Sequence, residues 1–186
     1  MSLYSSQRML LSILSAYMFI YLVMPFILYA FVRWRDSRSP NPDPQLGYKF
    51  GLNLINLVSI QIILGTGFFI ISVLLTSMTK KYFDWNSFRH AIGFLIPAII
   101  VLVVARVTIA NSNQSTHPGV GRFFDGINWL ITSISTIVIL FAFFQAIVAK
   151  RTPTETFTVM LPGIIIYGIA AYLFGLQVRN ASKAAG

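Results

Sequence analysis

The chain has 186 residues, of which 56% are hydrophobic and only 10% are charged, and its mean hydropathy is +0.73. Soluble domains carry about 25% charged residues, so this chain has too few charges to cover a surface that faces water. The composition excludes a soluble globular protein and indicates an integral membrane protein. Because the sequence has no cysteine, it also excludes disulfides, Cys-based metal sites and thiol nucleophiles.

Five apolar stretches are long enough to cross a bilayer as helices, which takes about 20 residues each. They are apolar at nearly every position, unlike the alternating strands of a membrane barrel, and a helix satisfies its own backbone groups in lipid. We therefore predict an all-α membrane protein with five transmembrane helices. The stretches are Met9 to Val32, Phe50 to Met78, His90 to Ala110, Ile127 to Ala149 and Phe157 to Val178.

Basic residues at the ends of these stretches set the predicted orientation. The loops after the first and third helices and the C-terminal tail share one side and hold eight of the 14 Lys and Arg residues. By the positive-inside rule, this side is cytoplasmic and the N-terminus lies outside, in an inner or cytoplasmic membrane. The eight are Arg33, Arg35, Arg38, Lys49, Arg106, Arg122, Arg179 and Lys183, against Arg8, Lys80, Lys81, Arg89, Lys150 and Arg151 on the other side.

The formal net charge of +9 does not require a nucleic-acid partner. Basic residues at helix ends meet anionic lipid headgroups, and no long basic run is present. The three tryptophans, Trp34, Trp85 and Trp129, fall at predicted helix ends, where aromatic belts lie in membrane proteins. We therefore expect the lipid bilayer, and no nucleic acid, as a partner.

Two segments that lead into predicted helices resemble each other. Pro44-Gln-Leu-Gly-Tyr-Lys-Phe-Gly-Leu-Asn53 and Pro118-Gly-Val-Gly-Arg-Phe-Phe-Asp-Gly-Ile-Asn128 both read P-x-[LV]-G-x-x-F-G-[LI]-N if Asp125 is an insertion. The likeness continues through Phe-Phe pairs and proline-centred segments further on. It predicts a leading helix with a Pro-rich loop at 1–43, then two parallel helical hairpins at 44–117 and 118–186.

Three predicted helices, the first, third and fifth, carry a proline. Pro25, Pro97 and Pro162 each remove one backbone donor and free a carbonyl one turn back, which can kink a helix. We predict kinks at all three, while proline is also simply more frequent in transmembrane helices.

Polar uncharged residues form one stripe on the second helix and one on the fourth. Such stripes either bond helix to helix or line a wet cavity, and we favour packing. Gln61 and Gln145 lie off the stripes, so we expect them to face other chains. The stripe residues are Asn53, Asn56, Ser59 and Thr66, then Asn128, Thr132, Ser135 and Thr136.

Arg106 is the main charge predicted within the membrane, four residues before the end of the third helix. It is a candidate for an anion or lipid-headgroup contact, or for an ion pair with Asp125 or Asp36 from a loop. We favour the alternative that its side chain extends to the interface.

Catalytic chemistry finds little support in the sequence. His90 and His117 are predicted at opposite faces, which excludes a bis-His haem within one chain. The carboxylates are isolated and are predicted in loops, so no metal site or nucleophile–base pair can be assembled. We expect no cofactor, no metal and no enzymatic activity. The carboxylates are Asp36, Asp43, Asp84, Asp125 and Glu155.

Two functions stay open. The first is a non-catalytic multi-pass subunit that packs in or scaffolds a larger membrane complex, with other membrane subunits or further copies as partners. The second is a small transporter or channel component for a neutral or anionic solute, acting as an oligomer. Lipid handling by the loop arginines is a third possibility.

Overall fold

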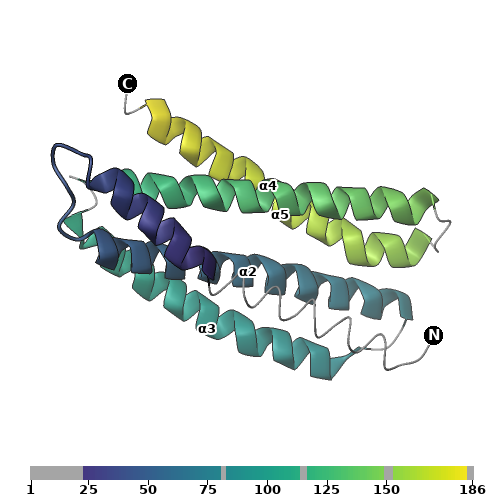
Figure 1. The fold of residues 1–186 in the computed structure, drawn as a ribbon. Helices are drawn as coiled ribbons and strands as arrows, with labels where there is room; N and C mark the ends of the chain where they lie inside the picture. The colour runs from purple at the N-terminus through teal and green to yellow at the C-terminus, as the bar shows by residue number, and fades with distance from the viewer. Residues whose placement is uncertain (1–22, 81–82, 114–116, 149–152, 184–186) are drawn as a thin grey trace, which may run out of the picture.

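The computed structural model describes residues 23–80, 83–113, 117–148 and 153–183. Its main elements are four long helices, shown in Figure 1: α2 (Leu46–Lys80), α3 (Trp85–Ala110), α4 (Gly119–Val148) and α5 (Pro153–Lys183). Residues 23–36 form a further helix, and the described residues contain no strand. Each of the four long helices is apolar and long enough to cross a membrane. The predicted all-α membrane fold is confirmed, whereas residues 9–22 of the first predicted span lie outside the described residues.

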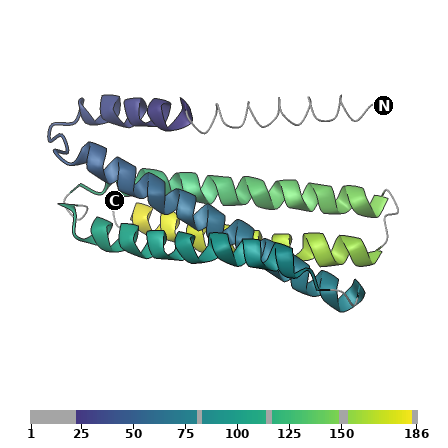
Figure 2. The same ribbon diagram turned by 90° about the horizontal axis from the view of Figure 1, so that it is seen from below.

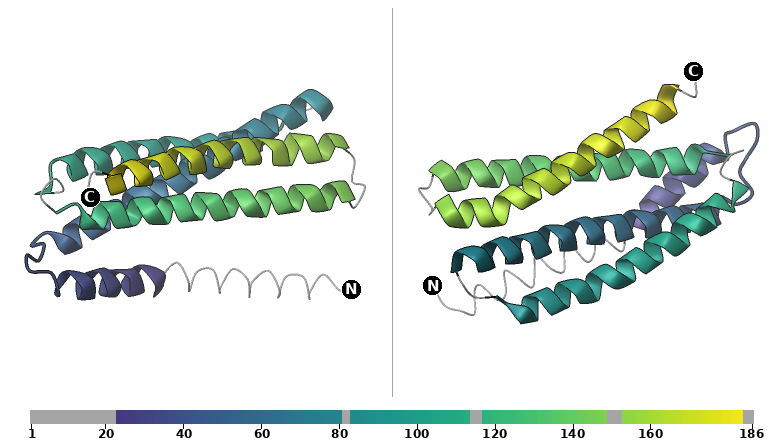
Figure 3. Two further views of the ribbon diagram at one scale, coloured as in Figure 1. Left: turned by 90° about the horizontal axis from the view of Figure 1, so that it is seen from above. Right: turned by 180° about the vertical axis from the view of Figure 1, so that it is seen from behind.

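The helices pack as two antiparallel hairpins with α2 at the centre. α3 packs mainly on α2 and α5 mainly on α4, and α2 also contacts α4 and α5. Figure 2 shows residues 23–36 on one side of the bundle, joined to α2 by a loop at one end. That end also carries the α3–α4 connection and the C-terminal end of α5 (Figure 3). We call it the basic end, because Arg33, Arg35, Arg38, Arg122 and Arg179 lie there.

Three helices begin earlier than their apolar stretches. α2 begins at Leu46 instead of Phe50, and α4 begins at Gly119 instead of Ile127, because their polar first turns are helical although they are not apolar. Asp125, which the sequence places in a loop, therefore lies within α4. α3 begins at Trp85, where the carboxylate of Asp84 accepts the backbone N–H groups of two residues in the first turn.

The core at the basic end joins residues 23–36 to α2 and α4. Phe50 is packed edge-on between Tyr29 and Phe124, with ring centroids 5.2 and 5.1 Å apart. Phe50 and Phe124 are equivalent positions of the predicted repeat, as are Leu46 and Val120, and all four lie in this core. The repeat itself stays a prediction. Contact between equivalent residues is what two parallel repeats around one axis would produce.

Glycine allows α5 to approach its neighbours closely at one point. A Cβ atom at Gly163 would lie 3.1 Å from Phe68 of α2 and 3.3 Å from Ile139 of α4, while one at Gly67 would meet nothing within 4 Å. Both α3 and α5 continue as helices through Pro97 and Pro162. The kinks predicted at these prolines and at Pro25 stay predictions.

Candidate functional site

A buried ion pair lies at the basic end, where α2 begins. The side chain of Lys49 is fully buried, and its Nζ lies 2.5 Å from Oδ2 of Asp43, which is itself buried. The same ammonium donates to the backbone carbonyl of His117 at 2.5 Å. A buried charge is tolerated only when it is paired and hydrogen-bonded, and Lys49 meets both conditions.

Asp43 is held by several donors. Its Oδ1 accepts the backbone N–H of Gln45 at 2.9 Å and the side-chain amide of Asn113 at 3.2 Å. Burial raises the pKa of Asp43, but the hydrogen bond from Lys49 and those from Gln45 and Asn113 outweigh burial, so its pKa lies below its ordinary value. Asp43 is therefore a carboxylate at neutral pH, and the pair is ionic.

The network connects three parts of the chain that are far apart in sequence. The backbone N–H of Asp43 donates to the carboxylate of Asp36 at 3.0 Å, and the backbone N–H of Asn113 donates to the side chain of Gln45 at 3.3 Å. The loop before α2, the first turn of α2 and the α3–α4 connection are joined in this way. We name the set the Lys49 latch. It comprises Asp36, Asp43, Gln45, Lys49, Asn113 and His117.

The sequence prediction missed this latch. It counted Lys49 as a charge of the first loop and Asp43 as an isolated carboxylate, and both assignments are wrong. The local signal was present, since Lys49 directly precedes the buried Phe50 and follows Asp43 by six positions. Its partners Asn113 and His117 are about seventy residues away, and no sequence pattern gives that proximity.

All eight residues of the two predicted polar stripes avoid the exposed surface. Asn53, Ser59, Asn128 and Thr132 are buried, and Asn56, Thr66, Ser135 and Thr136 are partly buried. Several bond to carbonyls of their own helix: Thr132 Oγ1 to Asn128 at 2.9 Å, and Thr136 Oγ1 to Thr132 at 2.8 Å. These bonds satisfy the hydroxyl groups within the bundle.

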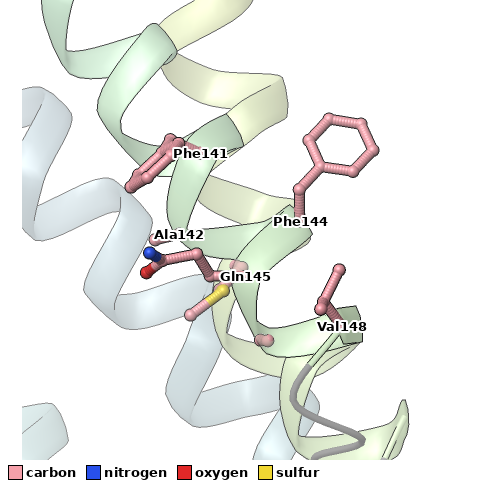
Figure 4. Close-up of a pocket in the computed structure, with 7 residues that line it drawn as sticks. Phe141, Ala142, Phe144, Gln145 and Val148 are labelled. Carbon is pink, nitrogen blue, oxygen red and sulfur yellow. The ribbon is translucent and has the colours of Figure 1, made fainter.

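Gln61 is one exception to the sequence-based expectation. Its side-chain amide donates to Oδ1 of Asn128 at 2.7 Å and so links α2 to α4, whereas the sequence placed it toward other chains. That prediction is wrong, because the long side chain reaches a partner that is off its own stripe. Gln145 is exposed and lines an apolar cleft of about 600 Å³ near the end of α4. Figure 4 shows its amide on the opposite side of the helix from Phe144.

Arg106 belongs to a second polar group nearer the membrane interior. Its Nε donates to Oδ1 of Asn56 at 3.3 Å. Asp125 accepts the amide of Gln177 at 3.0 Å and interacts electrostatically with Arg106. Among the described residues only Lys49 and Asp43 form an ion pair within 4 Å, so the Arg106–Asp125 attraction acts at longer range. The four side chains of this Arg106 group come from four different helices.

The two histidines lie at opposite ends of α3. His90 is within its second turn, with Nδ1 2.7 Å from the carbonyl of Asn86, and His117 follows the α3–α4 connection. In the part of the chain that the structure describes, no three His, Cys, Asp or Glu side chains come close enough to hold a metal ion.

Comparison of the chain with protein-family models, with curated proteins and with solved structures finds no match. The function therefore has to be argued from the geometry above.

Proposed function

We propose that the protein is a non-catalytic, multi-pass membrane subunit that packs within or scaffolds a larger membrane complex. The observation that carries the proposal is the surface of α3. Its buried residues are three alanines, Ala91, Ala98 and Ala105, spaced by seven. This narrow seam leaves most of the helix bare. The large side chains exposed on α3 are Trp85, Phe94, Ile96, Ile99, Ile100, Val101, Val103, Val104 and Val107.

The chemistry of this bare surface suits protein packing. Helices associate in lipid through van der Waals contact rather than through the hydrophobic effect. Ile and Val are stiff at χ1 in a helix, so packing them against a partner costs little side-chain entropy. The interior polar groups, by contrast, are already bonded within the chain, as the Gln61–Asn128 pair shows. The outer face of α3 is thus the part of the molecule best suited to a partner helix.

The first test is the mass of the protein extracted with its native lipids. Fixed stoichiometric partners, or a fixed number of copies, are expected by native mass spectrometry. A photocrosslinking amino acid at Val104 on α3 should give one discrete protein adduct, and the same group at the equally exposed Ile137 on α4 serves as the control. A monomeric mass together with lipid-only adducts at Val104 would overturn the proposal.

A second candidate function is a small transporter or channel component, and the Arg106 group favours it. A guanidinium, two amides and a carboxylate from four helices lie together in the half of the bundle near the basic end. Such a set could contact a neutral or anionic solute. The test is solute flux into liposomes: Arg106→Leu should abolish it, whereas Arg89→Leu, at the other end of α3, should not. Equal flux for empty liposomes and for liposomes with the protein would exclude this function.

A further inference from the structure

A cleft of about 620 Å³ opens at the basic end between residues 23–36, the loop that follows them and the start of α4. Its lining is mixed. Phe31 and Phe123 provide apolar walls, and Arg35, Asp36, His117 and Arg122 provide polar ones. Because the cleft lies where the spanning helices end, both the headgroup region and the outer acyl region of a bilayer are within its reach.

Two arginines from separate elements line this cleft. Arg35 comes from the helix at residues 23–36 and Arg122 from the first turn of α4, and both are exposed. Neither guanidinium has a hydrogen-bond, ion-pair or ring partner among the described residues. The neighbouring Arg38 differs, because its guanidinium stacks 4.2 Å above the ring of Trp34. Arg35 and Arg122 thus keep their full donor capacity for a ligand.

The carboxylates that line the cleft are already engaged. Asp43 is paired with Lys49. Both oxygens of Asp36 lie within 3.3 Å of the backbone N–H of Asp43. Two guanidinium groups and the Lys49 ammonium stand against two carboxylates, so the cleft carries a net positive charge. This charge favours an anion over a cation.

We propose that this cleft binds the phosphate of an anionic phospholipid. Guanidinium groups bind phosphate oxygens in a bidentate manner, and basic pockets between membrane helices take lipid headgroups. Phe31 and Phe123 would contact the first part of the acyl chains. The inference is independent of the proposed function, since it concerns a different surface from α3.

The experiment measures lipid retention by native mass spectrometry of the purified full chain, released from vesicles of phosphatidylglycerol and phosphatidylcholine in equal amounts. Phosphatidylglycerol should be retained preferentially. Arg35→Gln with Arg122→Gln should reduce its retention by about fivefold for each arginine. Arg33→Gln with Arg38→Gln, which removes the same charge from the same end outside the cleft, should leave retention close to that of the parent chain.

Further arms separate the sources of phosphate and guard against misfolding. Arg35→Lys with Arg122→Lys keeps the charge and should retain an intermediate amount of lipid, and circular dichroism should show unchanged helix content for every variant. Displacement of phosphatidylglycerol by millimolar inorganic phosphate would assign the site to free phosphate and overturn the lipid proposal. Equal retention of both lipids, or equal losses in the cleft pair and the control pair, would overturn it as well.

Discussion

At the scale of single residues, Lys49 is the most demanding position in the molecule. An ammonium withdrawn from water loses several kcal/mol of hydration free energy. Asp43 and the carbonyl of His117 replace part of that hydration. Such a pair contributes little net stability compared with an apolar pair of similar volume, but removal of one partner leaves a buried charge without compensation. The latch is therefore sensitive to single substitutions and tolerant of a matched double substitution.

Lys49→Met is expected to lower the free energy of unfolding by about 3–5 kcal/mol, because it leaves the Asp43 carboxylate buried without its cation. Lys49→Met combined with Asp43→Asn should recover most of this loss, since Asn keeps the acceptor for Gln45. Denaturant titration in detergent micelles measures both variants. Equal stability of Lys49→Met and the parent chain would show that the pair is not buried in solution.

The stability of the fold should depend on pH through Asp43. Its pKa is lowered from the ordinary value of 3.8 in the folded chain, so the unfolded chain takes up the proton first as the pH falls. The contribution of Asp43 is complete above about pH 4 and is lost as the pH falls through the lower, folded-state pKa. The melting temperature of the parent chain should therefore drop over this range, and that of Asp43→Asn should drop less.

Asp84 supplies the control for this pH series. Its hydrogen bonds to the hydroxyl and backbone N–H of Ser87 also lower its pKa, so Asp84 acts in the same direction although it is exposed to water. The difference between the parent chain and Asp43→Asn should persist when both also carry Asp84→Asn. If the difference vanishes in that background, the assignment to Asp43 is wrong.

At the scale of helices, the apolar stretches predicted where the chain crosses lipid but not where the helices begin. Hydropathy detects residues that face lipid, while the first turns of α2 and α4 face a protein core and carry polar residues. The polar stripes of α2 and α4 were placed correctly within the bundle, because helical spacing puts them on one face. The partner of Gln61 was not predictable, because it depends on how α2 crosses α4.

Gly163 is where α5 packs most tightly on both other hairpin partners, and it gives a prediction at this scale. Gly163→Leu should lower stability by about 1–3 kcal/mol through overpacking against Phe68 and Ile139. Gly67→Leu is the matched control, since it meets open space on α2, and it should leave the melting temperature nearly unchanged or raise it. Similar losses in the two variants would mean that the close approach of α5 is absent.

At the scale of the whole molecule, the charge distribution and the long-range contacts were unequally accessible from sequence. The fold class follows from composition alone, because so few charges leave only a lipid environment. The latch and the Arg106 group depend on contacts between loops and helices 50 to 70 residues apart, which periodicity does not encode. The lipid-facing exterior and the bonded interior together describe a unit stable in a bilayer with most of α3 still bare.

The burial of Lys49 also has a consequence for the order in which the chain assembles. Its acceptor His117 lies 68 residues further along, beyond the whole of α3, so the latch can close only after the first hairpin is inserted. Until then the amine is open to water and to acylating reagents. Brief acylation of nascent chains, followed by peptide mass analysis, should label Lys49 in partly synthesised chains and spare it in finished ones, which makes this one amine a reporter of completed insertion.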